Sequence, residues 1–369
     1  MNSRFNKIIK QSIVPAGLIA GFIACNKALP VAEPIQTPAP SGQSITTTIN
    51  NDANFTFLKA AIAKAATNST FGNNLNALLS DSTGVFTFFA PTDAAFQLSG
   101  FPSAAAVSAQ RAGLLDTILR YHLVPGQKIT SDLIPSTFPN IQEPTSLVLA
   151  PPSTAVPPGL RMPIFPSKRG TSLWANNIPI TQADIAASNG VVYKVAALVA
   201  PPSTTIKGII ATDPTNFSIL SAAIVRADSG QVGLNRLDSA MNYAPANLTL
   251  FAPTNAAFRA MFPPGTPDAN IIGALNTPAL FPAQIVRAMV AYHLLGSRAF
   301  SVNFGPTPAP YNTMLVIPPS TVVPVVATNA GASFTVKGVA NATASNVTTR
   351  DRNAINGVVH VIDQVLRPQ

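Results

Sequence analysis

The chain has 369 residues, which is enough for two ordinary domains. Apolar residues make up 47% of it and charged residues only 10%, and this balance excludes a highly charged, intrinsically disordered chain. The 23 basic and 14 acidic side chains give a net charge of +9, but the basic residues form no run, so we predict no nucleic-acid partner. With 35 prolines, long helices are not expected.

The N-terminal residues 1–24 are typical of a lipoprotein signal peptide. A basic, acid-free start leads into an apolar stretch over residues 13–24, which is too short to span a bilayer of about 30 Å as a helix. The stretch ends in Phe22-Ile23-Ala24-Cys25, which resembles a bacterial lipoprotein cleavage box, although such boxes usually have Leu at the first position. We expect cleavage before Cys25 and lipidation of its sulfur; the alternative is an ordinary signal peptide.

Residues 25–45 are predicted to form a lipid anchor followed by a Pro-rich tether. Several acyl chains on Cys25 would hold the protein firmly to a membrane. We therefore expect a cell-envelope protein that is lipid-anchored in the outer membrane. Whether the protein faces the cell surface or the periplasm stays open. A single cysteine excludes an internal disulfide, and with only three histidines we expect no metal and no cofactor.

The remainder of the chain is an internal repeat, in domains predicted at residues 46–202 and 203–369. Four sequence blocks recur in the same order, with nine extra residues in the second copy before the third block. The paired blocks are 54–58 with 216–220, 89–96 with 251–258, 121–123 with 292–294, and 189–192 with 356–359.

Each copy is predicted to mix short helices with strands. Apolar residues at helical spacing begin each copy, and β-formers bounded by turn residues mark the strands. The helices are expected over 55–62 and 217–224, at Phe96 and Phe258, and over 114–119 and 285–290; the strands over 85–89 and 248–251, 146–149 and 333–336, and 191–199 and 358–366. The last strand follows an Asn-Gly hairpin signal. This pattern favours an α+β fold.

The sequence resembles the fasciclin-like domain family. The resemblance rests on Phe-Ala-Pro-Thr-Asp/Asn-Ala-Ala-Phe, on Tyr-His-Leu, and on a last motif that is complete only at residues 356–368. It covers both copies, and it implies a β-sheet wedge with short helices packed on it. It also implies a surface-anchored or extracellular protein associated with adhesion, and not an enzyme.

The resemblance implies that the Tyr-His segment, Tyr121-His122 and Tyr292-His293, binds a partner. The alternative is that these residues end a core helix and hydrogen-bond to nearby backbone. His360 has no histidine counterpart in the first copy, where Tyr193 stands, and such an exchange favours packing over catalysis. The chain has no Gly-x-Ser-x-Gly motif, and we predict no catalytic residues.

A second candidate binding segment lies in an insertion-like stretch of the first copy, residues 151–171. It contains Arg161, Lys168 and Arg169, and Trp174 follows it. Arg and Trp are enriched at binding hot spots, so we predict that these four residues contact a partner; the alternative is a solvated loop.

Together these observations predict adhesion or binding to a surface polysaccharide or protein. Two other functions remain open: carriage of a hydrophobic small molecule such as a pigment, and a structural envelope role without a dedicated ligand.

Overall fold

In the computed structural model of the chain, the described residues are 42–68, 74–149, 153, 155–318 and 320–368. The predicted signal peptide, Cys25 and almost all of the tether lie outside them, so lipid anchoring stays a prediction. No helix in the described ranges is long and apolar enough to cross a bilayer.

The first copy mixes short helices and short strands in chain order. Its helical elements are α1 (Ile45–Asn51), η1 (Ala53–Phe55), α2 (Thr56–Ala65), α3 (Leu75–Ser80), α4 (Asp93–Leu98), α5 (Ala104–Ser108) and α6 (Ala112–Tyr121). Its strands are β1 (Phe86–Pro91), β2 (Leu123–Pro125), β3 (Glu143–Val148), β4 (Arg161–Ile164), β5 (Pro166–Arg169), β6 (Ser172–Ala175), β7 (Ile178–Ala187) and β8 (Gly190–Val195).

The second copy follows a similar order of elements, with one strand fewer in the described ranges. Its helical elements are α7 (Ile206–Ala211), α8 (Pro214–Ala227), η2 (Gly233–Asn235), α9 (Leu237–Ala240), α10 (Asn255–Arg259), α11 (Asp268–Leu275), α12 (Ala283–Tyr292) and η3 (Ser301–Asn303). Its strands are β9 (Leu248–Pro253), β10 (Leu294–Leu295), β11 (Ala309–Ile317), β12 (Thr321–Asn329), β13 (Phe334–Lys337), β14 (Ser345–Ala354) and β15 (Gly357–Ile362). The α+β class is confirmed.

The two sheets share one pairing pattern but close differently. The first sheet has the order β2-β1-β8-β7-β6-β5, with β3 and β4 paired separately, whereas β10-β11-β12-β13-β14-β15-β9 closes into a barrel. Within each copy, the strand that ends in Ala-Pro pairs in parallel with the last strand, β1 with β8 and β9 with β15. The other pairs are antiparallel.

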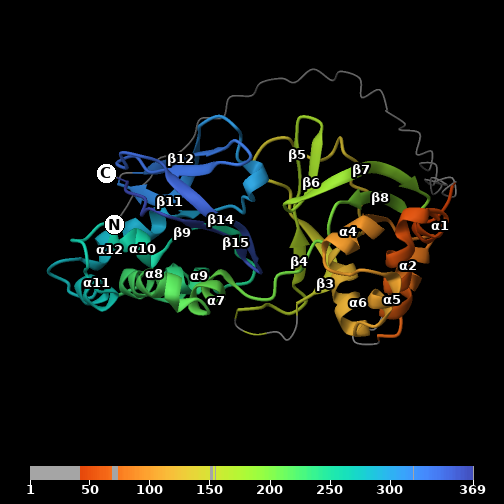
Figure 1. The fold of residues 1–369 in the computed structure, drawn as a ribbon, viewed down its shortest axis with the longest axis horizontal. Helices are drawn as coiled ribbons and strands as arrows, with labels where there is room; N and C mark the ends of the chain where they lie inside the picture. The colour runs from red at the N-terminus through yellow and green to blue at the C-terminus, as the bar shows by residue number, and fades with distance from the viewer. Residues whose placement is uncertain (1–41, 69–73, 150–152, 154, 319, 369) are drawn as a thin grey trace, which may run out of the picture. The chain divides into compact units, whose positions relative to one another are not determined.

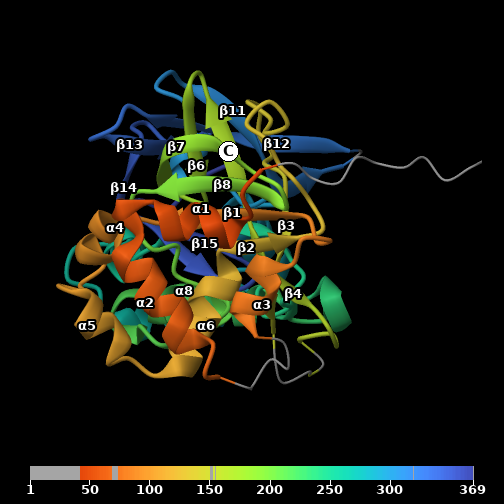
Figure 2. The same cartoon turned by 90° about the vertical axis from the view of Figure 1, so that its right-hand side faces the viewer.

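In both copies the helices gather on one side of the strands (Figures 1 and 2). The central strand is therefore buried on both faces, and its successive side chains enter two different apolar clusters. Phe88 packs with the helices of the first copy while Phe89 faces the other side; Leu250 and Phe251 repeat this alternation. This explains why the motif before Ala-Pro is continuously apolar.

The predicted amphipathic helices form, with one difference between the copies. Leu58 and Ile62 are buried in α2, and Leu220 and Ile224 are buried in α8. Phe55, however, lies in the η1 turn before α2. Pro214 occupies the first turn of α8, where its fixed φ starts the helix earlier in the second copy.

The last strand of each copy is shorter than predicted. β8 ends at Val195 and β15 at Ile362, because the chain then leaves the ladder. The N–H groups of Val199 and Leu366 donate instead to the imidazoles of the two Tyr-His motifs. The expected strands over 191–199 and 358–366 were therefore wrong in their last four residues.

The insertion-like stretch is also not a simple loop. Residues 161–164 and 166–169 are the strands β4 and β5, and both pair with neighbouring strands. The loop interpretation of this part was wrong, and before these strands Ser153 and Val156 form an isolated β-bridge.

The Asn-Gly signals form the predicted hairpins and also anchor a helix. Asn356 Oδ1 accepts the backbone N–H of Ile206, the first residue of α7, at 2.9 Å, and Asn189 does the same for Ile45 at 2.8 Å. Gly357 pairs with Leu248 in the parallel ladder, and a Cβ there would lie 2.2 Å from the Leu248 carbonyl oxygen. Only glycine fits this approach of the two strands.

We predict that Gly357→Ala lowers the free energy of unfolding by about 2–3 kcal/mol, because the contact is with backbone and cannot relax without disturbing the ladder. Gly273→Ala in α11 is the matched control, since a Cβ there meets nothing within 4 Å and should raise stability by about 0.5–1 kcal/mol. Urea unfolding of both variants measures the difference. Equal effects would contradict the close-approach argument.

Candidate functional site

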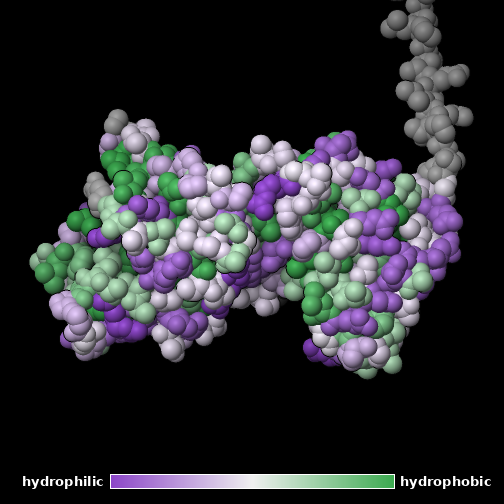
Figure 3. Space-filling view, turned by 45° about the horizontal axis from the view of Figure 1, so that its top comes forward, coloured by the Kyte–Doolittle hydropathy of each residue, from purple (hydrophilic) through white to green (hydrophobic). Residues whose placement is uncertain are grey.

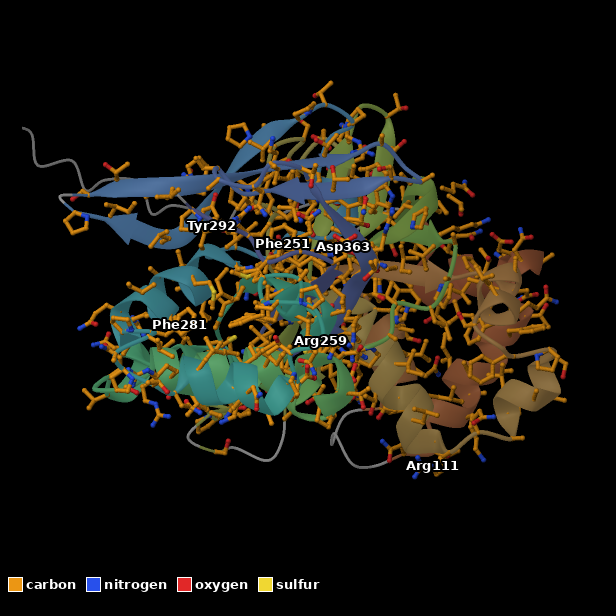
Figure 4. The ribbon with its side chains drawn as sticks, turned by 60° about the vertical axis from the view of Figure 1, so that its left-hand side comes forward. Arg111, Phe251, Arg259, Phe281, Tyr292 and Asp363 are labelled. Carbon is orange, nitrogen blue, oxygen red and sulfur yellow. The ribbon has the colours of Figure 1, made fainter. Side chains whose placement is uncertain are left out.

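The two Tyr-His pairs lie at the ends of α6 and α12, inside their domains. The exposed fraction of each of the four side chains is at most 1%. Figure 4 shows Tyr292 near Phe251, and the two residues belong to one apolar cluster of the second copy. Neither pair presents a side chain at the surface.

Both imidazoles use both ring nitrogens within the fold. Nδ1 of His122 lies 2.7 Å from the Ile118 carbonyl oxygen, and Nε2 accepts the N–H of Val199 at 3.0 Å. His293 repeats this with Met289 at 2.8 Å and Leu366 at 2.9 Å. A nitrogen that accepts an amide N–H carries no proton, so the partners assign a neutral ring protonated at Nδ1.

The tyrosine hydroxyls are satisfied in the same way. Tyr121 donates to the Pro163 carbonyl at 3.0 Å and accepts from Asn176 at 3.0 Å. Tyr292 donates to the Pro324 carbonyl at 2.9 Å and accepts the N–H of Val339 at 3.0 Å. These contacts favour the packing interpretation of the motif.

His360 and Tyr193 occupy equivalent positions in the two copies and make equivalent hydrogen bonds. His360 Nε2 donates to the Ala299 carbonyl at 2.9 Å, and the Tyr193 hydroxyl donates to the Ile129 carbonyl at 2.7 Å. Burial lowers the pKa of His360 and raises that of Tyr193, so both stay neutral.

The basic and aromatic residues that are predicted to contact a partner lie in two places in the structure. Lys168, Arg169 and Trp174 lie together on the β5–β6 hairpin, where the Arg169 guanidinium lies 5.5 Å from the centroid of the Trp174 ring. Arg161, at the start of β4, instead donates to the Thr145 carbonyl at 3.2 Å. Three of the four residues that are predicted to contact a partner therefore lie on one hairpin, and Arg161 lies on the strand before it.

This hairpin contacts the second copy. Arg169 Nη1 donates to the Phe304 carbonyl at 2.8 Å, and the side-chain amides of Asn140 and Asn303 exchange hydrogen bonds of 2.9 and 3.0 Å. Residues 40–369 form one compact unit that contains both copies. The β5–β6 hairpin can be followed in Figure 1.

A buried arginine of the second copy contacts an aromatic ring of the first copy. Arg298 donates to the Ile355 carbonyl at 2.8 Å and to Asn353 at 3.1 Å, and its guanidinium lies 4.6 Å from the Phe165 ring centroid. Burial lowers its pKa to about 10, so it stays charged at neutral pH. Phe165 also packs against Phe300 at 6.2 Å between ring centroids.

Two hollows lie where the copies meet. A cavity of about 420 Å³ is lined by Phe138 from the first copy and by residues that include Leu295 and Tyr311 from the second. A smaller one of about 40 Å³ is lined by residues that include Phe138 and Arg169. Phe138 and Tyr311 were not singled out from the sequence, although Tyr311 directly follows the Pro-rich run 306–310.

Within the described ranges, no group of three His, Cys, Asp or Glu side chains could hold a metal ion. The chemistry available at the junction is therefore that of aromatic rings, amides and cations.

Because its histidines are buried, we predict that the protein loses stability in weak acid. Burial lowers the pKa of His122 and His293 from 6.5 to about 4, so the unfolded chain binds more protons between these values. The contribution of these two neutral imidazoles to the free energy of unfolding is complete above pH 6.5 and is lost as the pH falls towards 4. At pH 5 we expect the free energy of unfolding to be lower than at pH 7.5 by about 2 kcal/mol for each histidine.

Urea unfolding at pH 7.5 and 5 measures this loss. Both pH values lie above the range in which the carboxylates with lowered pKa titrate. In His293→Gln the stability at pH 7.5 falls, but the further loss at pH 5 should be smaller than in the unmodified chain. An identical pH dependence in both proteins would show that the buried imidazole does not cause it.

A comparison with protein families identifies the family of both copies. The Fasciclin domain model matches residues 53–201 and 217–368. No curated protein matches the chain. A solved structure that it resembles is a FAS1 domain pair from the insect cell adhesion molecule Fasciclin I, at 16% identity and a TM-score of 0.35, with 86% of this chain and 98% of that chain covered. The chain therefore belongs to the Fasciclin domain family, which is associated with cell adhesion, and it carries two copies of the domain.

Proposed function

We propose that this protein is a lipid-anchored envelope adhesin that binds a polysaccharide or protein on a neighbouring surface. Its tandem Fasciclin domains are the observation that carries the proposal, because the family is associated with adhesion. The sequence around Cys25 supports the anchor, and the residues after it supply a tether. Two domains on one tether gain avidity if they engage neighbouring sites.

The packing of the barrel in the second copy favours surface binding over carriage of a small molecule. Phe304, Phe334 and His360 pack inside it with ring centroids 4.9 to 5.9 Å apart, so side chains occupy its interior. The surface drawn in Figure 3 mixes hydrophilic and hydrophobic residues, as a face in contact with water does.

Catalysis is not proposed, because the histidines are engaged by backbone groups. His122 and His293 have lowered pKa values and no route to solvent through their side chains, so neither can serve as a general base for an external substrate.

Protease shaving of intact cells tests the proposed location. We expect loss of the two-domain fragment while a periplasmic control protein survives. Protection until the envelope is opened would overturn the adhesin proposal.

Replacement of the single cysteine tests the anchor separately. In Cys25→Ser the sulfur that carries the lipid is absent, so we expect the protein to move from the membrane fraction to the soluble fraction and to lose label from a radioactive fatty acid. The variant should keep its far-ultraviolet circular dichroism, since position 25 precedes both domains. Continued membrane association with unchanged labelling would contradict lipidation at this residue.

A further inference from the structure

We infer that the junction between the two domains is a binding site for an acidic carbohydrate chain. The inference rests on the proposed adhesive function and names its ligand class. The site consists of two hollows that both have Phe138 in their lining, called here the junction groove; Tyr311 lines the larger hollow, and Arg169, Asn140 and Asn303 line the smaller one.

The size of the groove suits a small ligand segment. The larger hollow, about 420 Å³, lies within the range of roughly 300–1,000 Å³ that small-molecule sites occupy. Phe138 and Pro139 of the first copy form part of its wall, and the backbone around Ser297 and Pro310 of the second copy forms another part.

Aromatic rings supply an apolar platform in the groove. Phe138 and Tyr311 meet edge to face, with centroids 5.9 Å apart, and Tyr311 also packs against Phe304 at 4.7 Å. Phe138 and Tyr311 are only half-buried, whereas Phe304 is fully buried and fixes the Tyr311 ring from behind. A rigid, half-exposed ring can stack on the C–H face of a sugar with little loss of conformational entropy.

Amide groups supply donors for hydroxyl or carboxylate oxygens. Asn140 and Asn303 each use one side-chain N–H on the other residue, and a primary amide has two. Among the described residues, the second N–H of each amide has no recorded acceptor, so a ligand oxygen can take it.

Charge in the groove favours an acidic ligand. Arg169 is exposed, and the described residues offer it no carboxylate partner; its recorded contacts are the Phe304 carbonyl and the Trp174 ring. Burial raises the pKa of the Tyr311 phenol, and the nearby Arg169 guanidinium offsets a part of this rise. Lys168 contributes less, because it donates to the Ser131 carbonyl at 3.3 Å and faces the Asp184 carboxylate.

Rings at the larger hollow, together with amides and a cation without a carboxylate partner at the smaller one, match a sugar chain that bears carboxylates. The test measures binding of oligogalacturonate to the full chain in a nonionic detergent by isothermal titration calorimetry, at low salt. Maltohexaose is the neutral carbohydrate probe and hexaglutamate the acidic peptide probe. We expect oligogalacturonate to bind best, and to bind more weakly as salt rises.

Substitutions in the groove then locate the site. Arg169→Gln and Tyr311→Ala should each weaken oligogalacturonate binding about tenfold, through loss of a charged donor and of a stacking ring. Tyr311→Phe keeps the ring and should stay within about twofold of the unmodified chain. Arg111→Gln removes the same charge on the helical side of the first copy, away from the second copy (Figure 4), and should also stay within about twofold.

Three results would overturn the inference: no binding of oligogalacturonate, equal or tighter binding of hexaglutamate, or equal losses in Arg169→Gln and Arg111→Gln. Unfolding midpoints of the variants separate a lost site from a lost fold, and Arg169→Gln guards against an unstable Tyr311→Ala. If shaving places the domains outside but the groove variants bind like the unmodified chain, the adhesin proposal stands and this site does not. If shaving shows protection, the adhesin proposal fails whatever the groove binds.

Discussion

A neutral, buried imidazole holds each domain together at the point where its helices meet its sheet. In the second copy, His293 receives the N–H of Leu366 and faces the Met289 carbonyl, so the ring bridges the end of α12 and the segment after the last strand. The backbone carbonyl of His293 also accepts a hydrogen bond from the N–H of Phe251 in the central strand. A single residue thus ties a helix, a strand and the closing segment, and leaving any of these groups unpaired would cost about 1–3 kcal/mol.

The exchange of His360 for Tyr193 shows what the interior requires at a neighbouring position. Both side chains donate one hydrogen bond to the carbonyl of an equivalent loop residue, Ala299 or Ile129. A phenol and an imidazole differ in basicity but share a planar ring with a polar edge, so the position selects shape and a donor and not acid–base chemistry. This is why a histidine in this family motif carries no inference of catalysis.

The sequence revealed the parts of the fold that depend on local order. The repeat, the helix faces and the Asn-Gly hairpins follow from spacing and turn chemistry, and the structure confirms them. It did not reveal where the last strands end, because N–H groups of the segments that follow them donate to histidines more than 70 residues away. Nor did it reveal the junction groove, since Phe138 and Tyr311 are separated by more than 170 residues and neither belongs to a repeated block.

The junction groove links ligand recognition to the contact between the copies. Its walls come from both domains, and the same contact buries the Arg298 guanidinium against Phe165. The Arg298 guanidinium has no carboxylate partner among the described residues; it donates to Asn353 and Ile355 of its own copy, and the Phe165 ring of the first copy lies against it. The contact of this cation with a ring of the other copy favours one arrangement of the two domains, and a groove whose walls are already in place binds a ligand at a smaller ordering cost.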